Sequence, residues 1–142
     1  DLDAGVDFTQ ARPPGLDKSA EAVSDLIFHL NSEKLVLGGF SQGAMISTEV
    51  ALNQPEDLAG LILLSGALLD ESGWQKKASG LKGKKVLQSH GQADAVIPFA
   101  ASQRLSELLK GGGADLDWIP FGGGHEIPMP VLQRAKKFLA GL

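Results

Sequence analysis

The chain has 142 residues, of which 43% are hydrophobic and 21% are charged, a composition typical of one globular domain with an apolar core. Its net charge of -4 gives no reason to expect nucleic acid or an anionic membrane as partner, and its lack of cysteine excludes disulfides and a thiolate nucleophile. The most apolar stretch, residues 58–69, is shorter than the roughly 20 residues of a membrane span. We therefore expect no nucleic-acid partner, no membrane span and a cytoplasmic location.

The N-terminal part predicts a loop followed by one helix. Residues 1–15 show no regular period and contain Pro13-Pro14-Gly15, so we expect an irregular approach loop. Asp17 is predicted to cap a helix whose apolar residues share one face: Ala20, Val23, Leu26, Ile27 and Leu30. His29 in this helix is expected to be a surface histidine without a function.

Strands and helices then alternate to the end of the chain. The expected strands are residues 34–40, 58–65, 86–90 and 116–121. The expected helices follow Ser41, begin at Pro98 and begin at Pro128 or Pro130, whereas residues 67–80 are expected to form a loop. Because this alternation produces right-handed βαβ crossovers, we predict an α/β protein: a single domain, residues 1–142, with a parallel sheet and helices on both faces.

Gly39-Phe40-Ser41-Gln42-Gly43 is a G-x-S-x-G pentapeptide between an expected strand and an expected helix. A sharp strand-to-helix turn lifts a serine hydroxyl clear of the sheet, where it can act as a nucleophile. Both glycines are expected to prevent collisions between the strand and the helix. The alternative is a glycine-rich structural turn, since the chain has 18 glycines, but the flanking strand and helix favour the nucleophile.

Two further loops at the carboxyl ends of strands carry groups that activate a serine. Asp94 follows the third expected strand and His125 follows the fourth, so the chain order is Ser, Asp, His. His125 is predicted to take the proton of Ser41, and Asp94 to orient the imidazole. The backbone N–H of Gln42, at the helix N-terminus, is predicted to donate to the oxyanion.

Several of these assignments have alternatives. Asp70 follows the second expected strand and competes with Asp94 for the role of the acid, while His125 could instead cap the last helix or bond a loop carbonyl. His90 is expected to brace the loop of Asp94 rather than to act as the base. No group of histidines and carboxylates has the spacing of a metal site. Candidates for the wall of an acyl pocket, with plain packing as the alternative, are Leu68, Trp74 and Val96.

Three motifs together carry a resemblance to a known family. They are Gly39-Phe40-Ser41-Gln42-Gly43, His90-Gly91-Gln92-Ala93-Asp94 with Val96-Ile97-Pro98, and Gly123-Gly124-His125-Glu126-Ile127. From about Asp17 to the C-terminus the chain resembles the phospholipase/carboxylesterase family of α/β-hydrolases, which includes acyl-protein thioesterases. The resemblance implies an α/β-hydrolase-type sheet and a serine carboxylesterase, lysophospholipase or thioesterase. It further implies a small ester or thioester substrate, no cofactor, and a triad of Ser41, Asp94 and His125.

One part of the family pattern is missing. Members of this family begin with further strands and a His-Gly motif that supplies a second oxyanion donor, and no such segment precedes Ser41. We therefore expect the chain to be the C-terminal two-thirds of a longer domain that lacks its N-terminal strands. The strand at 34–40 would then have an open outer edge, which proteins ordinarily avoid. We expect the missing segment or a second copy of the chain to pair there.

Two alternatives to an active esterase stay open at this point. The first is a catalytically inactive fragment that associates through its open sheet edge. The second, within the hydrolases, is a peptidase or a lipase, which the residues do not distinguish from an esterase.

Overall fold

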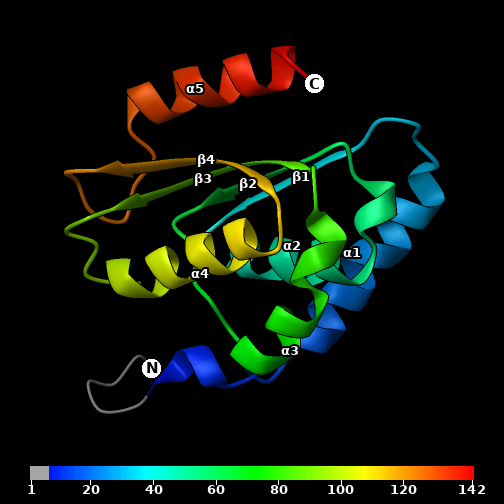
Figure 1. Cartoon of the computed structure of the whole chain (residues 1–142), viewed down its shortest axis with the longest axis horizontal. Helices are drawn as coiled ribbons and strands as arrows, with labels where there is room; N and C mark the ends of the chain where they lie inside the picture. Colours follow the sequence, from blue (N-terminus) through cyan, green and yellow to red (C-terminus); the bar gives the residue numbers. More distant parts are fainter. Residues whose placement is uncertain (1–6) are drawn as a thin grey trace.

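The computed structural model describes residues 7–142, which form a four-stranded parallel sheet with helices on both faces (Figure 1). The strands are β1 (Val36–Phe40), β2 (Gly60–Leu64), β3 (Lys85–Gly91) and β4 (Asp115–Phe121), in the spatial order β1-β2-β3-β4. The helices of these residues are α1 (Leu16–Leu30), α2 (Gln42–Asn53), α3 (Glu71–Lys77), α4 (Phe99–Gly111) and α5 (Met129–Ala140). Short 3-10 helices are η1 (Phe8–Gln10), η2 (Pro55–Asp57) and η3 (Ala78–Leu81).

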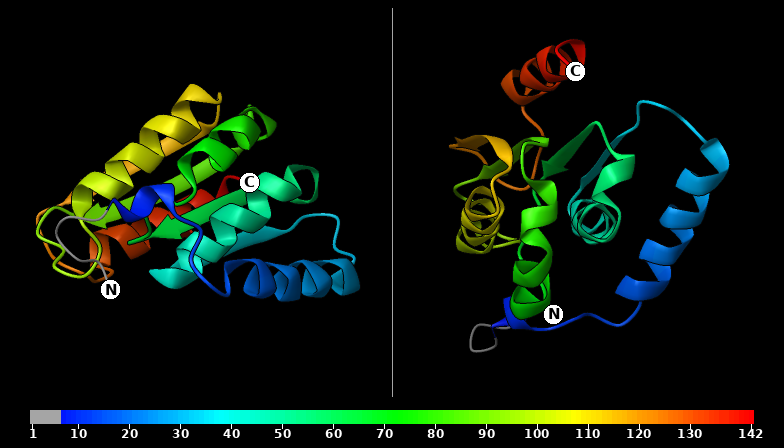
Figure 2. Two further views of the ribbon diagram at one scale, coloured as in Figure 1. Left: turned by 90° about the horizontal axis from the view of Figure 1, so that it is seen from below. Right: turned by 45° about the vertical axis from the view of Figure 1, so that its right-hand side comes forward.

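The helices cover the sheet unequally. On one face α2 contacts β1 and β2 while α4 contacts β3 and β4, and α1 packs beside α2 (Figure 2). Of the helices in the described residues, α5 alone lies over the opposite face. The main apolar core lies between the sheet and the layer of α2 and α4, and includes Leu61, Leu63, Val86, Leu105 and Leu109. Within residues 7–142 no helix combines the length and the apolar character that crossing a membrane requires.

The register of the sheet positions the loops that follow its strands. Phe40, the last residue of β1, pairs with Leu64, and Gly91, the last residue of β3, pairs with Phe121 at the end of β4. All pairings are parallel, so the carboxyl ends of these strands lie at one edge of the sheet. The predicted parallel α/β architecture is therefore confirmed.

Three details of local structure differ from the sequence prediction. Helix α1 begins at Leu16 with Gly15 at its N-cap, where φ is 88°, so Asp17 lies in the first turn and is not the cap. The expected approach loop contains η1, and its residues 1–6 lie outside the described part of the chain. The expected loop at 67–80 folds instead into α3 and the start of η3, because the fully buried ring of Trp74 anchors it in the core.

An ion pair with a buried carboxylate joins the segment before α1 to the middle of α2. Arg12 donates from Nη1 to Glu49 Oε1 at 3.2 Å and from Nη2 to Glu49 Oε2 at 2.9 Å. The Glu49 side chain is only 4% exposed, and it also accepts from Trp74 Nε1 at 2.8 Å and from Asn53 Nδ2 at 3.0 Å. Burial raises the pKa of Glu49, but the hydrogen bonds from Arg12, Trp74 and Asn53 outweigh it and lower the pKa to about 2.

We expect acid to destabilise the fold through Glu49. Its pKa is lower in the folded chain, about 2, than the 4.5 of an unperturbed glutamate, so its stabilisation is present above about pH 4.5 and disappears as the pH falls toward 2. A pKa difference of that size corresponds to about 3 kcal/mol in the free energy of unfolding. Urea unfolding at pH 7 and pH 3 should show a smaller loss of stability on acidification for Glu49→Gln than for the wild type. Equal losses would contradict this role.

Candidate active site

Ser41 lies in a strained turn between β1 and α2. Its backbone adopts φ 59° and ψ -118°, a combination that residues with a side chain rarely show. The turn is held by a hydrogen bond from the Ser41 N–H to the Leu64 carbonyl at 2.7 Å. Because α2 begins at the next residue, the hydroxyl of Ser41 is presented at the carboxyl edge of the sheet.

The two glycines of the pentapeptide do different things. A Cβ at Gly39 would lie 2.3 Å from the carbonyl carbon and oxygen of Gly43 and 2.7 Å from the nitrogen of Ala44, so only glycine fits there. A Cβ at Gly43 would meet nothing within 4 Å. The expectation of a collision is therefore right for Gly39 and wrong for Gly43, because the Cα–Cβ direction at Gly43 points away from the strand.

Ser41, His125 and Asp94 form one continuous chain of hydrogen bonds. His125 Nε2 lies 3.0 Å from Ser41 Oγ, and His125 Nδ1 lies 2.8 Å from Asp94 Oδ2. Since a carboxylate accepts, the proton of the neutral imidazole is on Nδ1, and the lone pair of Nε2 faces the serine hydroxyl. The loops after β1, β3 and β4 thus bring together the three residues that the sequence singles out.

The carboxylate of Asp94 is held in its charged form. Its side chain is fully buried, and Oδ1 accepts from the backbone N–H groups of Val96 and Ile97, each at 2.8 Å. Burial raises the pKa of Asp94, but the hydrogen bonds from Ile97, His125 and Val96 outweigh it, so the pKa lies below its ordinary value. A charged acceptor therefore faces His125 Nδ1.

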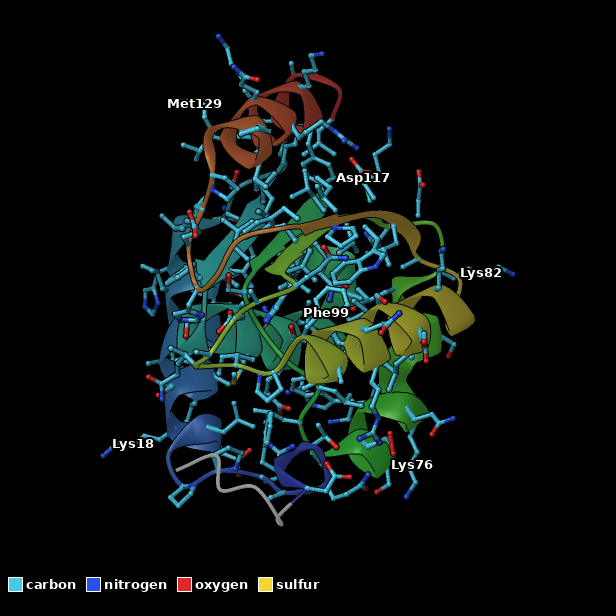
Figure 3. All side chains as sticks on the ribbon, turned by 90° about the vertical axis from the view of Figure 1, so that its left-hand side faces the viewer. Lys18, Lys76, Lys82, Phe99, Asp117 and Met129 are labelled. Atoms are coloured by element: carbon cyan, nitrogen blue, oxygen red, sulfur yellow. The ribbon has the colours of Figure 1, made fainter. Side chains whose placement is uncertain are left out.

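His90 supports the Asp94 loop from beneath, as the sequence predicts. Its fully buried ring places Nε2 at 2.8 Å from the carbonyl oxygen of Ile97 and 3.2 Å from Asp94 Oδ2. The carbonyl acceptor requires the proton on Nε2, which makes His90 a donor in this loop. Phe99 lies at the start of α4 (Figure 3). Its ring is edge-on to His90 at 6.1 Å and stacks on Trp118 at 5.8 Å.

The other candidate residues lie apart from this chain of hydrogen bonds. Asp70, the alternative acid, pairs with Arg12 Nη1 at 2.6 Å before α3. His29 is exposed on α1, as expected, and its Nδ1 lies 2.7 Å from the Asp25 carbonyl oxygen.

The Asp94 loop and the His125 loop are packed backbone to backbone. A Cβ at Gly91 would lie 2.2 Å from the carbonyl oxygen of Gly124 and 2.3 Å from that of Gly123. The Ala93 N–H donates to the Gly123 carbonyl at 3.0 Å. This contact fixes the distance between the acid and the imidazole, and the glycine-rich run before His125 is its sequence signal.

A small cavity of about 100 Å³ lies beside the first turn of α2. Gln42, the first residue of α2, lines it, and its N–H is one of the helix N–H groups without an intrahelical acceptor. The remaining lining residues come from the segment before α1, from α1, from α2 and from the chain after β2: Pro13, Pro14, Gly15, Leu16, Ser19, Met45, Ile46 and Leu69.

Two of the three residues predicted for the pocket wall lie in the main core, which favours the packing alternative for them. Leu68 and Trp74 are 1% and 0% exposed in the main core and do not line this cavity, because the segment that carries them folds inward as α3. Val96 is exposed, and its backbone serves Asp94. Pro13 and Pro14, which line this cavity, were not predicted to do so; their only local signal in the sequence is the rigid turn that they form with Gly15.

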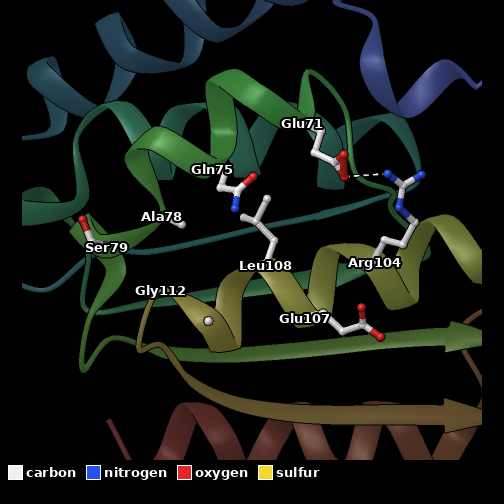
Figure 4. A pocket seen from close by; sticks show the side chains of 9 residues that line it. Glu71, Gln75, Ala78, Ser79, Arg104, Glu107, Leu108 and Gly112 are labelled. Carbon is white, nitrogen blue, oxygen red and sulfur yellow. Dashed lines mark hydrogen bonds and ion pairs between the residues drawn. The ribbon is translucent and has the colours of Figure 1, made fainter.

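A larger groove of about 470 Å³ lies between α3 and α4 (Figure 4). It is crossed by the ion pair between Arg104 and Glu71, at 2.5 Å, and its rim is polar. Neither Gln42 nor any residue of the hydrogen-bonded chain lines this groove, so we do not assign it to the site.

The comparison with known families agrees with this geometry. A family model described as Phospholipase/Carboxylesterase matches residues 6–142. The chain belongs to the phospholipase/carboxylesterase family. The family that the three motifs indicate is thereby confirmed.

The chain is similar to curated members of this family over part of their length. It is 33% identical over 111 residues to acyl-protein thioesterase 1 of Gibberella zeae, covering 75% of this chain and 47% of the relative. It is 28% identical over 136 residues to acyl-protein thioesterase 1 homolog 1 of Dictyostelium discoideum, covering 90% of this chain and 60% of the relative. The chain thus spans about half the length of these relatives.

Solved structures confirm the predicted fold class. The structure of esterase PE8 has a TM-score of 0.80 at 30% identity, covering 99% of this chain and 67% of that one. Zea mays acyl-protein thioesterase 2 has a TM-score of 0.75 at 25% identity, covering 99% of this chain and 69% of that one. These neighbours are α/β-hydrolases, so the sheet of this family member is of the α/β-hydrolase type.

The contrast between the two glycines yields a matched pair of variants. Gly39→Ala should destabilise the protein by more than about 2 kcal/mol, since its Cβ meets backbone atoms that cannot move aside independently of β1 and α2. Gly43→Ala adds the same methyl group in open space and should leave the free energy of unfolding within about 0.5 kcal/mol, or raise it, since alanine favours a helix. Urea unfolding of both variants tests this, and similar effects at the two positions would contradict it.

Proposed function

We propose that the protein is a serine hydrolase of carboxylic esters or thioesters that works through an acyl-enzyme on Ser41. The observation that carries this proposal is the unbroken chain of hydrogen bonds from Ser41 Oγ through His125 to the charged Asp94. Membership of the phospholipase/carboxylesterase family supports it, as do relatives that are named acyl-protein thioesterases and an esterase.

In the proposed reaction His125 moves one proton in each half. Nε2 takes the proton of Ser41 as Oγ forms a bond to the substrate carbonyl carbon, and the resulting imidazolium is stabilised by Asp94. The oxyanion accepts a hydrogen bond from the Gln42 N–H. His125 then gives its proton to the leaving alcohol or thiol, which departs. A water molecule that gives a proton to His125 then attacks the acyl-serine carbonyl. His125 returns this proton to Ser41 Oγ as the ester bond breaks and the carboxylic acid leaves.

We assign the acyl group to the cavity beside Gln42. Its walls are mostly apolar and begin at the residue that carries the oxyanion donor, so a carbonyl group held there would direct its alkyl chain among Met45, Ile46 and Leu69. The cavity holds about 100 Å³, and a water molecule occupies about 30 Å³ of liquid, so a short acyl chain suits it.

An activity-based probe tests this proposal directly. A fluorophosphonate should form one covalent adduct, located by mass spectrometry on Ser41, and Ser41→Ala should show none. Asp94→Asn, which leaves His125 in the wrong tautomer, should lower kcat for p-nitrophenyl acetate by about 10⁴ while the protein stays folded. The absence of an adduct on folded protein, or an adduct that persists in Ser41→Ala, would overturn the assignment.

A second candidate is an inactive chain that associates through the outer edge of β1. The observation in its favour is that, among the described residues, β1 pairs only with β2, while Phe40 at its end is 38% exposed. Pairing of that edge with a second copy or with further polypeptide would cover it.

Size-exclusion chromatography with light scattering, combined with hydrolysis of p-nitrophenyl acetate, separates the two candidates. Edge association predicts an oligomer that grows with concentration and has negligible turnover. A concentration-independent monomer with turnover would exclude it and would leave the hydrolase.

A further inference from the structure

Glu49 is a buried charge for which the proposed reaction has no use. It lies on α2, the helix that begins immediately after Ser41. A buried carboxylate is costly unless it is fully paired, and this one is. Oε1 accepts from Arg12 and Trp74, and Oε2 accepts from Arg12 and Asn53, which occupies the roughly four acceptor positions of an ionised carboxylate.

Arg12 connects Glu49 to two further elements. Its guanidinium also pairs with Asp70, just before α3, at 2.6 Å, and with Asp17 in the first turn of α1. The neighbouring residue Ala11 accepts a backbone hydrogen bond from Asp70 at 3.0 Å. The planar fork of an arginine fixes direction as well as distance in such contacts, so the chain at Arg12 has one orientation relative to α2.

The residues directly after Arg12 form the missed wall of the cavity. Pro13 and Pro14 have restricted backbones, and Gly15 turns the chain into α1 with φ 88°. The wall therefore has two fixed ends, Arg12 on one side and the start of α1 on the other. Facing it across the cavity is the first turn of α2, which includes Gln42.

We propose that the Arg12–Glu49 ion pair is a positioning element that holds Pro13–Leu16 against α2 and thereby sets which acyl groups the cavity accepts. Neither Arg12 nor Glu49 lines the cavity, so both act through the wall that follows Arg12. The inference rests on the proposed function, because it takes the cavity as the acyl site. It adds to that function a determinant of substrate choice that lies outside the hydrogen-bonded chain of Ser41, His125 and Asp94.

The first test is the dependence of kcat/KM on acyl length. Two additional methylene groups, buried in an ordered cavity, are worth about tenfold, so the wild type should favour p-nitrophenyl butyrate over the acetate by about that ratio. In Arg12→Gln this ratio should fall to about 1, mainly because the KM for the butyrate rises. The kcat/KM for the acetate should stay within about twofold of the wild type. Arg12→Lys keeps the charge but loses the fork, and should lie between the two.

Arg134→Gln is the matched control. Arg134 on α5 pairs with Asp117 on β4 at 2.6 Å, and both side chains are about half exposed. This variant therefore removes an arginine and an ion pair away from the wall. It should keep the wild-type ratio. If Arg12 had only a structural role, Arg12→Gln would lower kcat/KM for the acetate and the butyrate equally, or change neither. Either result, in a folded Arg12→Gln protein, would overturn the proposal.

Hydrogen exchange supplies a readout that does not need turnover. The Leu16 amide bonds to the Pro13 carbonyl at 3.2 Å and the Asp70 amide to that of Ala11, and both should exchange faster in Arg12→Gln while the amides of β3 do not. Unchanged exchange at both amides would refute the holding role even if the enzyme proved inactive. Failure of Ser41 labelling and ester turnover in the wild type would instead refute the proposed function. If Arg12→Gln does not fold, both the ester ratio and the amide exchange are measured on Arg12→Lys instead.

Discussion

The close approach of β1 to α2 at Gly39 is the constraint on which the site depends. The chain reverses from strand to helix within Ser41, and the backbone of Gly39 passes so near to Gly43 that a methyl group would not fit. The strained backbone conformation of Ser41 costs on the order of 1–3 kcal/mol, and it persists only because the surrounding structure forces it. Here the hydrogen bond from Ser41 N–H to the Leu64 carbonyl of β2, and the close packing of Ala44 against Gly66 just after β2, hold the turn in place.

A second close backbone contact positions the other half of the site. Gly91 ends β3 directly against Gly123 and Gly124, so the loops of Asp94 and His125 are fitted to each other before any side chain is considered. The parallel register then places both beside the turn of Ser41. The hydrogen-bonding distances of about 3 Å among the three side chains follow from these backbone contacts. A serine hydrolase needs this pre-organisation, because a hydroxyl held out of reach of its base is a poor nucleophile.

Local patterns in the sequence predicted most of this arrangement. The apolar runs and the glycine and proline stops identified the four strands to within two residues at each end, and the order Ser41, Asp94, His125 identified the hydrogen-bonded chain. What failed depends on partners far along the chain. The helix at α3 exists because Trp74 is buried and donates to Glu49, 25 positions away. The cavity wall depends on Arg12 and Glu49, which are 37 positions apart. The open space at Gly43 depends on a side-chain direction that no motif encodes.

Helix α2 links the strained turn to the ion pair of the buried Glu49. Its N-terminus follows Ser41, carries the N–H of Gln42 and forms one side of the cavity, while its middle carries Glu49. Replacing a buried ion pair by well-packed apolar residues is often neutral or stabilising, so stability alone is a weak reason for a carboxylate at this position. An apolar contact would, however, let the segment before α1 shift along the helix. Because the guanidinium of Arg12 binds both oxygens of Glu49, it fixes one position of this segment on α2. In that position Pro13 and Pro14 face Gln42, which carries the oxyanion donor.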